Sequence, residues 1–254
     1  MTLSARSLSL ERGGVRVLHG VSADLQPATI TAIVGPNGAG KSSLLLALAG
    51  LLSPSEGEAA LDGQTLSAIA AQDRAKALGF LPQSAEIAWD VAAENVVALG
   101  RLPYRDAGRE AIESAITALS LEPLRHRPAS QLSGGEKARV LLARVLAGEP
   151  RWILADEPLA ALDLAHQLNL IAHLKACASA PAGQGVVIVL HDLALAMNHA
   201  DRVLVLHDGR LVAEGAPADA LSEQTIAAVW DVEARWIGRA GQRALVPVTG
   251  PMGA

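Results

Sequence analysis

The chain has 254 residues, a formal net charge of −5 at pH 7 and a single cysteine, Cys177. This length suits one sizeable α/β domain with a smaller inserted lobe better than two independent domains. The acidic balance excludes the overall basic field with which proteins bind nucleic acids nonspecifically, so we expect no nucleic-acid partner, and the lone cysteine excludes an intrachain disulfide.

Mean hydropathy is high, at +0.29, but the longest apolar runs stay well below the roughly 20 residues that span a bilayer. The N-terminal segment alternates like a strand and lacks the basic head and continuous apolar stretch of a signal peptide. We therefore expect a cytosolic protein that does not cross a membrane by itself.

The first predicted elements form a small β layer. Residues 3–25 have period-two character and carry a Gly-Gly turn at Gly13 and Gly14, which is typical of an antiparallel hairpin. Apolar runs of strand length then occur at residues 29–35, 151–156 and 185–192, each followed by a stretch with helical periodicity. This alternation predicts an α/β fold with a mostly parallel sheet covered by helices.

The pattern changes between residues 85 and 130, where amphipathic helical stretches are joined by proline-containing segments. We interpret residues 85–130 as an inserted helical lobe, with residues 1–84 and 131–215 forming the core. The extension at 216–254 carries one short helical pattern, at 220–230, and we expect the rest of it to be irregular.

The segment GPNGAGKS, from Gly35 to Ser42, matches G-x-x-x-x-G-K-[ST] and lies between a predicted strand and a predicted helix. Its glycines let backbone N–H groups converge on phosphate oxygens, Lys41 reaches the terminal phosphates, and the Ser42 hydroxyl ligates Mg²⁺. The alternative is a chance glycine-rich turn. The candidate nucleotide-binding residues here are Gly35, Pro36, Asn37, Gly38, Ala39, Gly40, Lys41, Ser42 and Ser43.

Two carboxylates, Asp156 and Glu157, end the predicted strand at 151–156, where ligands of α/β proteins bind. Asp156 is suited to hold Mg²⁺ through water, and Glu157 can accept a proton from the water that attacks the γ-phosphate. Alone, such a pair is commonly a solvated turn or a helix cap. Together with GPNGAGKS, it predicts ATP hydrolysis.

A third motif, LSGGE at residues 132–136, begins a predicted helix and offers a second anion site. The chain resembles the ATP-binding subunits of ABC transporters, whose signature this segment matches, and the resemblance covers nearly the whole chain. It implies a P-loop NTPase core that hydrolyses ATP with Mg²⁺. It also implies a head-to-tail homodimer, in which the signature of one copy completes the ATP site of the other. The signature residues are Ser133, Gly134, Gly135 and Glu136.

The resemblance assigns three further residues. Gln83 matches the loop glutamine that senses Mg²⁺ and water and meets the membrane subunit, His191 matches the switch histidine that contacts the γ-phosphate, and Asp163 matches a loop that couples the two sites. Taken alone, Gln83 is a surface turn residue and His191 a structural histidine.

One position departs from the family pattern. Arg12 stands where the resemblance implies an aromatic residue that stacks on adenine. A planar guanidinium can also lie over a π face, so we expect Arg12 to take this role.

Residues 93–104 and the short C-terminal tail are similar to importers of iron-siderophores, haem and cobalamin. The resemblance then implies polytopic membrane permease subunits, an extracellular or periplasmic substrate-binding protein, and a peripheral location on the cytoplasmic face of the cell membrane.

Two alternatives remain open at this point. The ATPase of an exporter or lipid-extraction system would carry the same core motifs. A non-transport ABC ATPase would share the nucleotide site, but the single motif set and the short distance from Lys41 to Leu132 argue against that class.

Overall fold

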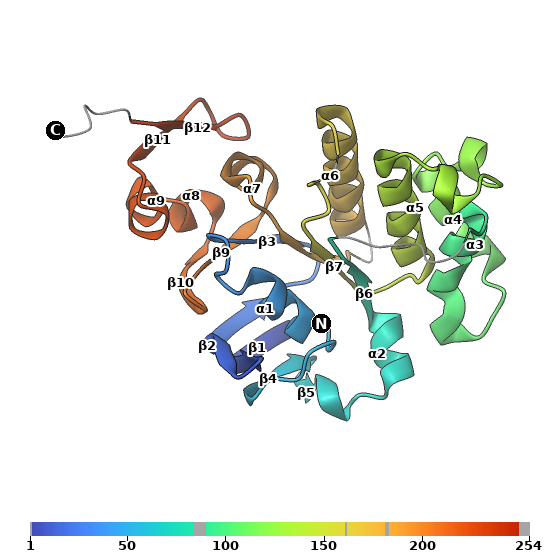
Figure 1. The fold of residues 1–254 in the computed structure, drawn as a ribbon, viewed down its shortest axis with the longest axis horizontal. Helices are drawn as coiled ribbons and strands as arrows, with labels where there is room; N and C mark the ends of the chain where they lie inside the picture. The colour runs from blue at the N-terminus through green and yellow to red at the C-terminus, as the bar shows by residue number, and fades with distance from the viewer. Residues whose placement is uncertain (1, 84–89, 161, 181–182, 249–254) are drawn as a thin grey trace.

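The computed structural model describes residues 2–83, 90–160, 162–180 and 183–248. A central sheet runs across the molecule, with a smaller antiparallel sheet below it and most helices above it or at its end (Figure 1). Within the described ranges, every helix is too short or too polar to cross a membrane.

The central sheet has the strand order β10-β9-β3-β8-β7-β6. All neighbours are parallel except β10, which runs antiparallel to β9. Every residue of β3, β7 and β8 is buried, as expected for strands covered on both faces. The predicted, mostly parallel sheet is confirmed. Its strands are β3 (Ile30–Val34), β6 (Leu78–Leu81), β7 (Trp152–Asp156), β8 (Gly185–Val189), β9 (Arg202–His207) and β10 (Arg210–Gly215).

The antiparallel sheet has the order β2-β1-β4-β5, with β1 at Leu3–Arg12, β2 at Val15–Leu25, β4 at Glu56–Leu61 and β5 at Gln64–Thr65. Gly13 and Gly14 form the turn between β1 and β2 with positive φ angles of 57° and 79°, which confirms the predicted hairpin. β4 and β5 were not expected from the sequence. The helix α1 (Lys41–Leu48) contacts strands of both sheets, so it forms the layer between them.

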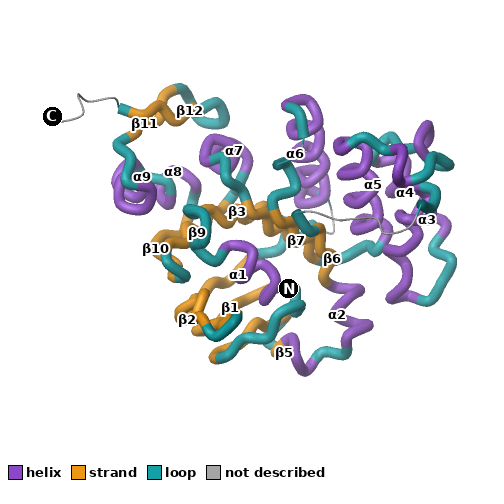
Figure 2. The backbone as a smooth tube through the Cα atoms, viewed as in Figure 1, coloured by secondary structure: helices purple, strands orange, loops and turns teal. Residues whose placement is uncertain are grey.

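The opposite face of the central sheet is covered by α6 (Leu164–Ser179) and α7 (Leu193–His199), with α5 (Gly134–Ala147) beside them toward the lobe (Figure 2). Buried side chains of these helices pack with the sheet in one core, and those of α1 and the antiparallel sheet form a second core on the other face. The central strand β3, whose carboxyl end leads into the loop at Gly35, therefore lies between two packed layers.

A group of short helices packs against α5 at one end of the molecule (Figure 1). They lie within the predicted helical lobe, whose residues 85–89 are outside the described ranges. Before them, 3₁₀ helix η1 (Leu66–Ala68) and α2 (Ala71–Ala77) connect the antiparallel sheet to β6. The helices of the lobe are α3 (Ala93–Ala98), η2 (Leu99–Tyr104), α4 (Arg109–Ala118), η3 (Glu122–Leu124) and η4 (Ala129–Gln131).

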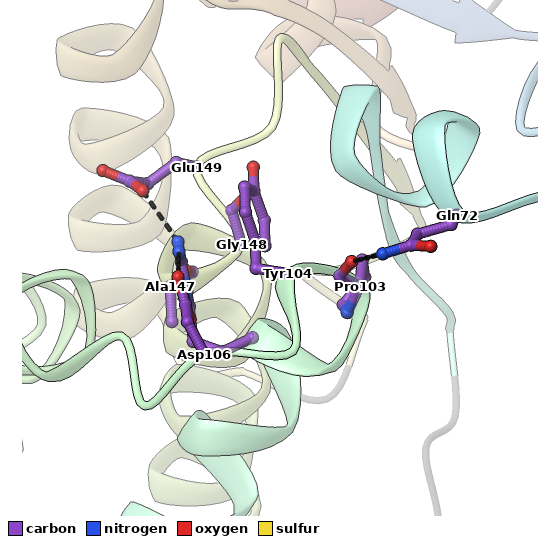
Figure 3. A network of polar contacts seen from close by, with 8 residues as sticks. Gln72, Pro103, Tyr104, Asp106, Ala147, Gly148 and Glu149 are labelled. Atoms are coloured by element: carbon purple, nitrogen blue, oxygen red, sulfur yellow. Dashed lines mark hydrogen bonds and ion pairs between the residues drawn. The ribbon is translucent and has the colours of Figure 1, made fainter.

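A buried arginine of η2, Arg101, joins η2 to the end of α5, where it contacts Ala147 and Glu149. Figure 3 labels the residues around it, among them Tyr104, Asp106 and Glu149. The Arg101 side chain is 8% exposed and contacts the carboxylates of Asp106 and Glu149 at 2.7 Å each. Its guanidinium lies 3.8 Å from the centroid of the Tyr104 ring, and the Tyr104 hydroxyl donates to the carbonyl of Gly148 at 2.9 Å. We call Arg101, Tyr104, Asp106 and Glu149 the Arg101 joint.

The C-terminal extension is more regular than its sequence indicates. After α8 (Pro217–Ala220) and α9 (Glu223–Trp230), strands β11 (Ala234–Ile237) and β12 (Ala244–Pro247) pair as an antiparallel hairpin. The expectation of an irregular end was wrong for these residues. The hairpin is held by contacts distant in sequence: Trp236 Nε1 donates to the carbonyl of Leu221 at 2.8 Å, and the Asn198 amide bonds both backbone groups of Arg243 at 2.8 Å.

Candidate active site

The loop from Gly35 to Gly40 connects the end of β3 to the start of α1. Gly35 has φ of 154°, and a Cβ at this position would lie 2.1 Å from the carbonyl oxygen of Leu206; at Gly40, with φ of 95°, it would lie 2.7 Å from Leu18 Cδ2. No larger residue fits either place without displacing backbone or core. Close packing against β9 and β2 therefore explains Gly35 and Gly40, whereas Gly38 has open space around it and is explained by its positive φ of 81°.

Lys41 is buried, with 5% of its surface exposed, and its Nζ donates to the carbonyls of Gly35 and Pro36 at 2.9 Å each. Burial lowers the pKa of Lys41, and the nearby carboxylates of Glu157 and Asp156 oppose that shift. The ammonium group is thus held at the loop with its charge only partly compensated.

Asp156 ends β7 directly beside the start of α1. Ser42 Oγ donates to Asp156 Oδ1 at 3.0 Å. Burial raises the pKa of the Asp156 carboxyl, while the hydrogen bond from Ser42 opposes the rise. The two oxygens predicted to serve a metal ion are therefore neighbours.

Glu157 lies between Gln83 and His191, and we call these three residues the Glu157 cluster. Its backbone has a left-handed φ of 46°, and its side chain is 12% exposed. Gln83 Nε2 donates to Glu157 Oε2 at 2.6 Å, and His191 Nε2 lies 2.5 Å from Glu157 Oε1. Gln83, Glu157 and His191 follow β6, β7 and β8, so the carboxyl ends of three neighbouring parallel strands bring them together.

An open pocket of about 540 Å³ contains most of the predicted nucleotide site. It joins the glycine-rich loop to the Glu157 cluster and also reaches Arg12, an exposed residue at the end of β1. Val17 lines the pocket and was missed, because one apolar residue in a strand gives no signal of a ligand. The lining residues are Arg12, Val17, Asn37, Gly38, Ala39, Gly40, Lys41, Ser42, Ser43, Gln83, Glu157 and His191.

The predicted signature residues do not line this pocket. Ser133 caps α5 in a reciprocal capping box, in which Glu136 N donates to Ser133 Oγ at 3.3 Å and Ser133 N donates to Glu136 Oε2 at 2.8 Å. Arg127 contacts the same Glu136 carboxylate at 3.0 Å. Asp163, which caps α6, is also absent from the pocket lining. One chain therefore gathers the P-loop, Gln83, Glu157 and His191, but leaves Asp163 and the signature apart.

The donor set favours a metal ion that depends on a polyphosphate. Within the part of the chain that the structure describes, no group of three or more His, Cys, Asp or Glu is arranged to hold a metal ion. Mg²⁺ usually takes one or two protein oxygens and completes its shell with phosphate oxygens and water. The Ser42 hydroxyl and the Asp156 carboxylate fit that requirement.

This chain is similar to known proteins over most of its length. A family model described as ABC transporter matches residues 18–160. The hemin import ATP-binding protein HmuV of Bordetella parapertussis is 40% identical over 246 residues, covering 92% of this chain and 94% of that protein.

Two solved structures extend the comparison to the fold. A transporter described as of the metal-chelate ABC type, in an inward-facing conformation, has a TM-score of 0.83 at 25% identity and covers 98% of both chains. A dimeric ATP-binding cassette bound to ADP and Pi has a TM-score of 0.75 at 28% identity, covering 85% of this chain and 98% of that one.

Proposed function

This chain belongs to the ABC transporter family, and from that premise we propose that it powers import of a metal chelate, with haem as the first candidate. As a member of the family it is an ATPase subunit of a transporter. The observation that carries the assignment of hydrolysis to particular residues is the Glu157 carboxylate, held between Gln83 at 2.6 Å and His191 at 2.5 Å beside the P-loop. Haem is favoured because a hemin import protein is 40% identical over nearly the whole chain.

The proposed mechanism assigns a separate task to each side chain. The N–H groups of Gly38 to Ser43 and the ammonium of Lys41 bind the phosphates of ATP. Glu157 accepts a proton from a water molecule as the water oxygen attacks the γ-phosphorus and the bond to the β–γ bridging oxygen breaks. His191 orients the Glu157 carboxylate and contacts the γ-phosphate.

Mg²⁺ would be held by Ser42, Asp156 and Gln83, and would neutralise charge that develops on the β- and γ-phosphates. Ser42 and Asp156 are already joined by a hydrogen bond of 3.0 Å. Their oxygens therefore need little rearrangement to share an ion.

We propose that a second copy completes each site. The signature residues Ser133, Gly134, Gly135 and Glu136 lie outside the P-loop pocket of their own chain, and a head-to-tail dimer would bring them to the partner's nucleotide. This assembly is supported by the dimeric cassette to which the chain is similar. Two-fold symmetry then produces two equivalent sites, with Asp163 beside the contact between them.

The same proposal divides the chain by task. Residues 1–84 and 131–215 form the nucleotide-binding core, 85–130 the lobe that meets a polytopic membrane permease, and 216–254 a C-terminal extension. A substrate-binding protein outside the membrane would deliver the chelate. The subunit would act at the cytoplasmic face of the membrane, as a peripheral protein.

The first test is Glu157→Gln. We expect ATP hydrolysis to fall at least about 100-fold, because a positioned general base contributes roughly 10²- to 10⁴-fold, while ATP binding is retained. The purified wild-type chain and the variant are compared in ATPase assays over a range of protein concentration, and dimerisation in MgATP is followed by light scattering. Wild-type activity should rise steeply with concentration, and the variant should accumulate as an inactive dimer.

Glu110→Gln is the matched control, because it removes an exposed carboxylate on α4, away from the pocket. Normal hydrolysis by Glu157→Gln would refute the assignment of Glu157. Hydrolysis by a monomer at a rate independent of concentration would refute the shared site. For the substrate, uptake of haem, an iron-siderophore or cobalamin by vesicles containing the complete transporter distinguishes the candidates.

A further inference from the structure

Two described residues of the loop after Glu157, Leu159 and Leu162, are bonded to the first turn of α6. Gln167 Nε2 donates to two carbonyls of this loop, those of Leu159 and Leu162, at 3.1 Å each. Leu162 N also donates to the Leu159 carbonyl at 3.1 Å, and Leu159 is buried. A side-chain amide has two N–H donors, and both are used here. Gln167 thus ties the loop backbone to the helix at two points.

His166 holds the end of the same loop. Its backbone N donates to Asp163 Oδ1 at 2.9 Å, and its Nδ1 lies 2.7 Å from the same oxygen. These contacts lower the pKa of the Asp163 carboxyl. Asp163 is therefore held as a charged helix cap, in a fixed orientation relative to α6.

The His166 ring also lies against the start of α5. A Cβ built on Gly135 would lie 3.4 Å from His166 Cδ2 and 3.6 Å from His166 Nδ1. The two helices are neighbours in Figure 1. One side chain therefore contacts Asp163 and also lies beside Gly135, with no room for more than a Cβ between them.

From this geometry we propose that His166 and Gln167 are positioning residues that link the Glu157 loop to the signature segment of the same chain. The inference rests on the proposed function, in which Glu157 acts on the ATP of its own P-loop and the signature contacts the ATP of the partner. When the signature binds the partner's nucleotide and moves, His166 transmits the movement to Asp163. Gln167 transmits it to the loop that follows Glu157. Hydrolysis at the two sites is thereby coupled.

His166 and Gln167 are absent from the lining of the nucleotide pocket. Gln167 instead lines a smaller adjacent pocket that Glu157 and His191 also line, and its side-chain amide donates to loop carbonyls. Loss of their contacts should therefore change the rate of hydrolysis and its dependence on ATP concentration, and leave the affinity for nucleotide nearly unchanged.

Two substitutions remove the contacts while keeping the size of the side chain. Gln167→Glu loses both donors and places a carboxylate against two carbonyl oxygens. His166→Phe keeps a ring beside Gly135 and the backbone N–H that donates to Asp163, but it lacks the ring nitrogen that contacts Asp163 Oδ1. Asn169→Ala is the matched control, because Asn169 is exposed on the same helix two residues further on.

The measurements are kcat, KM and the Hill coefficient for ATP hydrolysis, the affinity for a fluorescent ATP analogue, and the thermal midpoint. We expect Gln167→Glu to lower kcat by about fivefold or more and His166→Phe by about two- to threefold, with analogue affinity changed less than about twofold. Both should lower the Hill coefficient toward 1. Asn169→Ala should match wild type.

A wild-type kcat and Hill coefficient in both variants would overturn the inference, and so would a wild-type chain without cooperativity. A loss of activity in the folded variants that weaker analogue binding fully explains would also overturn it. If Gln167→Glu does not fold, His166→Phe decides the question alone. If Glu157→Gln is inactive while both variants behave as wild type, this inference is wrong and the proposed function stands. If Glu157→Gln hydrolyses ATP normally, the proposed function itself is wrong.

Discussion

The nucleotide site and the Arg101 joint both bury a basic side chain, but they treat its charge in opposite ways. Hydrogen bonds to Asp106 and Glu149 raise the pKa of Arg101 further above neutrality. At the nucleotide site, burial lowers the pKa of Lys41 and raises that of Asp156, so both shifts disfavour the charged forms. The Arg101 joint keeps the charge of Arg101 paired and fixed. The nucleotide site holds the charges of Lys41 and Asp156 in surroundings that disfavour them, and a bound polyphosphate would change that balance.

This difference separates structure from function among charged residues. Sites that perform chemistry collect groups with perturbed pKa values, because the fold must hold them in positions suited to the ligand. A structural ion cluster shifts pKa values too, but toward the charged state. Burial of a charge is therefore less informative than the direction in which its surroundings move the pKa.

Lys41→Met tests the site half of this comparison. We expect ATP affinity to fall about 100-fold or more, because the variant lacks the buried cation that the proposed mechanism places at the terminal phosphates. Stability should be maintained or improved at pH 7.5. A lysine with a lowered folded pKa destabilises the fold below that pKa, and the penalty disappears as the pH rises toward the unfolded value of about 10.4.

Titration calorimetry with MgATP and urea unfolding without nucleotide measure the two effects. Lys175→Met, at an exposed lysine on α6, is the control. A large loss of stability in Lys41→Met, with affinity preserved, would make Lys41 a structural residue like Arg101.

Arg101→Met tests the joint and should give the reverse result. We expect the free energy of unfolding to fall by about 2 kcal/mol, through lost hydrogen bonds and the lost stack on Tyr104. The cost stays moderate because the Asp106 and Glu149 side chains are 49% and 63% exposed, so water solvates them once Arg101 is gone. Nucleotide affinity of the folded variant should remain within about twofold of wild type.

Urea unfolding midpoints and calorimetry check this prediction, with Arg109→Met at an exposed position on α4 as control. A strong loss of ATP affinity without loss of stability would contradict the separation of the two regions.

The sequence predicted the nucleotide site better than the joint, for a physical reason. The P-loop, Glu157 and His191 each follow a buried strand, and parallel strands bring their carboxyl ends together without further information. The contact between Arg101 and Glu149 depends on how η2 packs on the end of α5, which no local pattern encodes. The same holds for Gln167, whose partners are backbone carbonyls.

The missed strands have a similar explanation. β4, with the sequence EGEAAL, lacks the β-branched and aromatic residues that favour strands, and it forms by pairing with β1. In the C-terminal hairpin, Trp236 is hydrogen-bonded to Leu221, directly after α8, and Arg243 is hydrogen-bonded to Asn198 of α7. In both regions, tertiary contacts override weak local preference.

Of the Lys41, Arg101 and Arg12 substitutions, Arg12→Ala has the smallest expected effect, and it tests a residue at the rim of the nucleotide pocket. Arg12 lines the nucleotide pocket but is exposed and stands apart from the paired charges of both regions. If its guanidinium stacks on adenine, Arg12→Ala should weaken ATP binding by about fivefold, or about 1 kcal/mol.

Calorimetry with ATP and with inorganic tripolyphosphate separates stacking from charge. Stacking predicts that Arg12→Ala weakens ATP alone, that Arg12→Tyr retains affinity because its ring supplies a π face, and that Arg12→Lys resembles Arg12→Ala because an ammonium has no planar surface. If tripolyphosphate binding falls as much as ATP binding and recovers in Arg12→Lys, Arg12 acts as a charge on the phosphates. Adenine would then lack a stacking partner at this position, and the site would distinguish ATP from other nucleoside triphosphates only weakly, which competition with GTP measures directly.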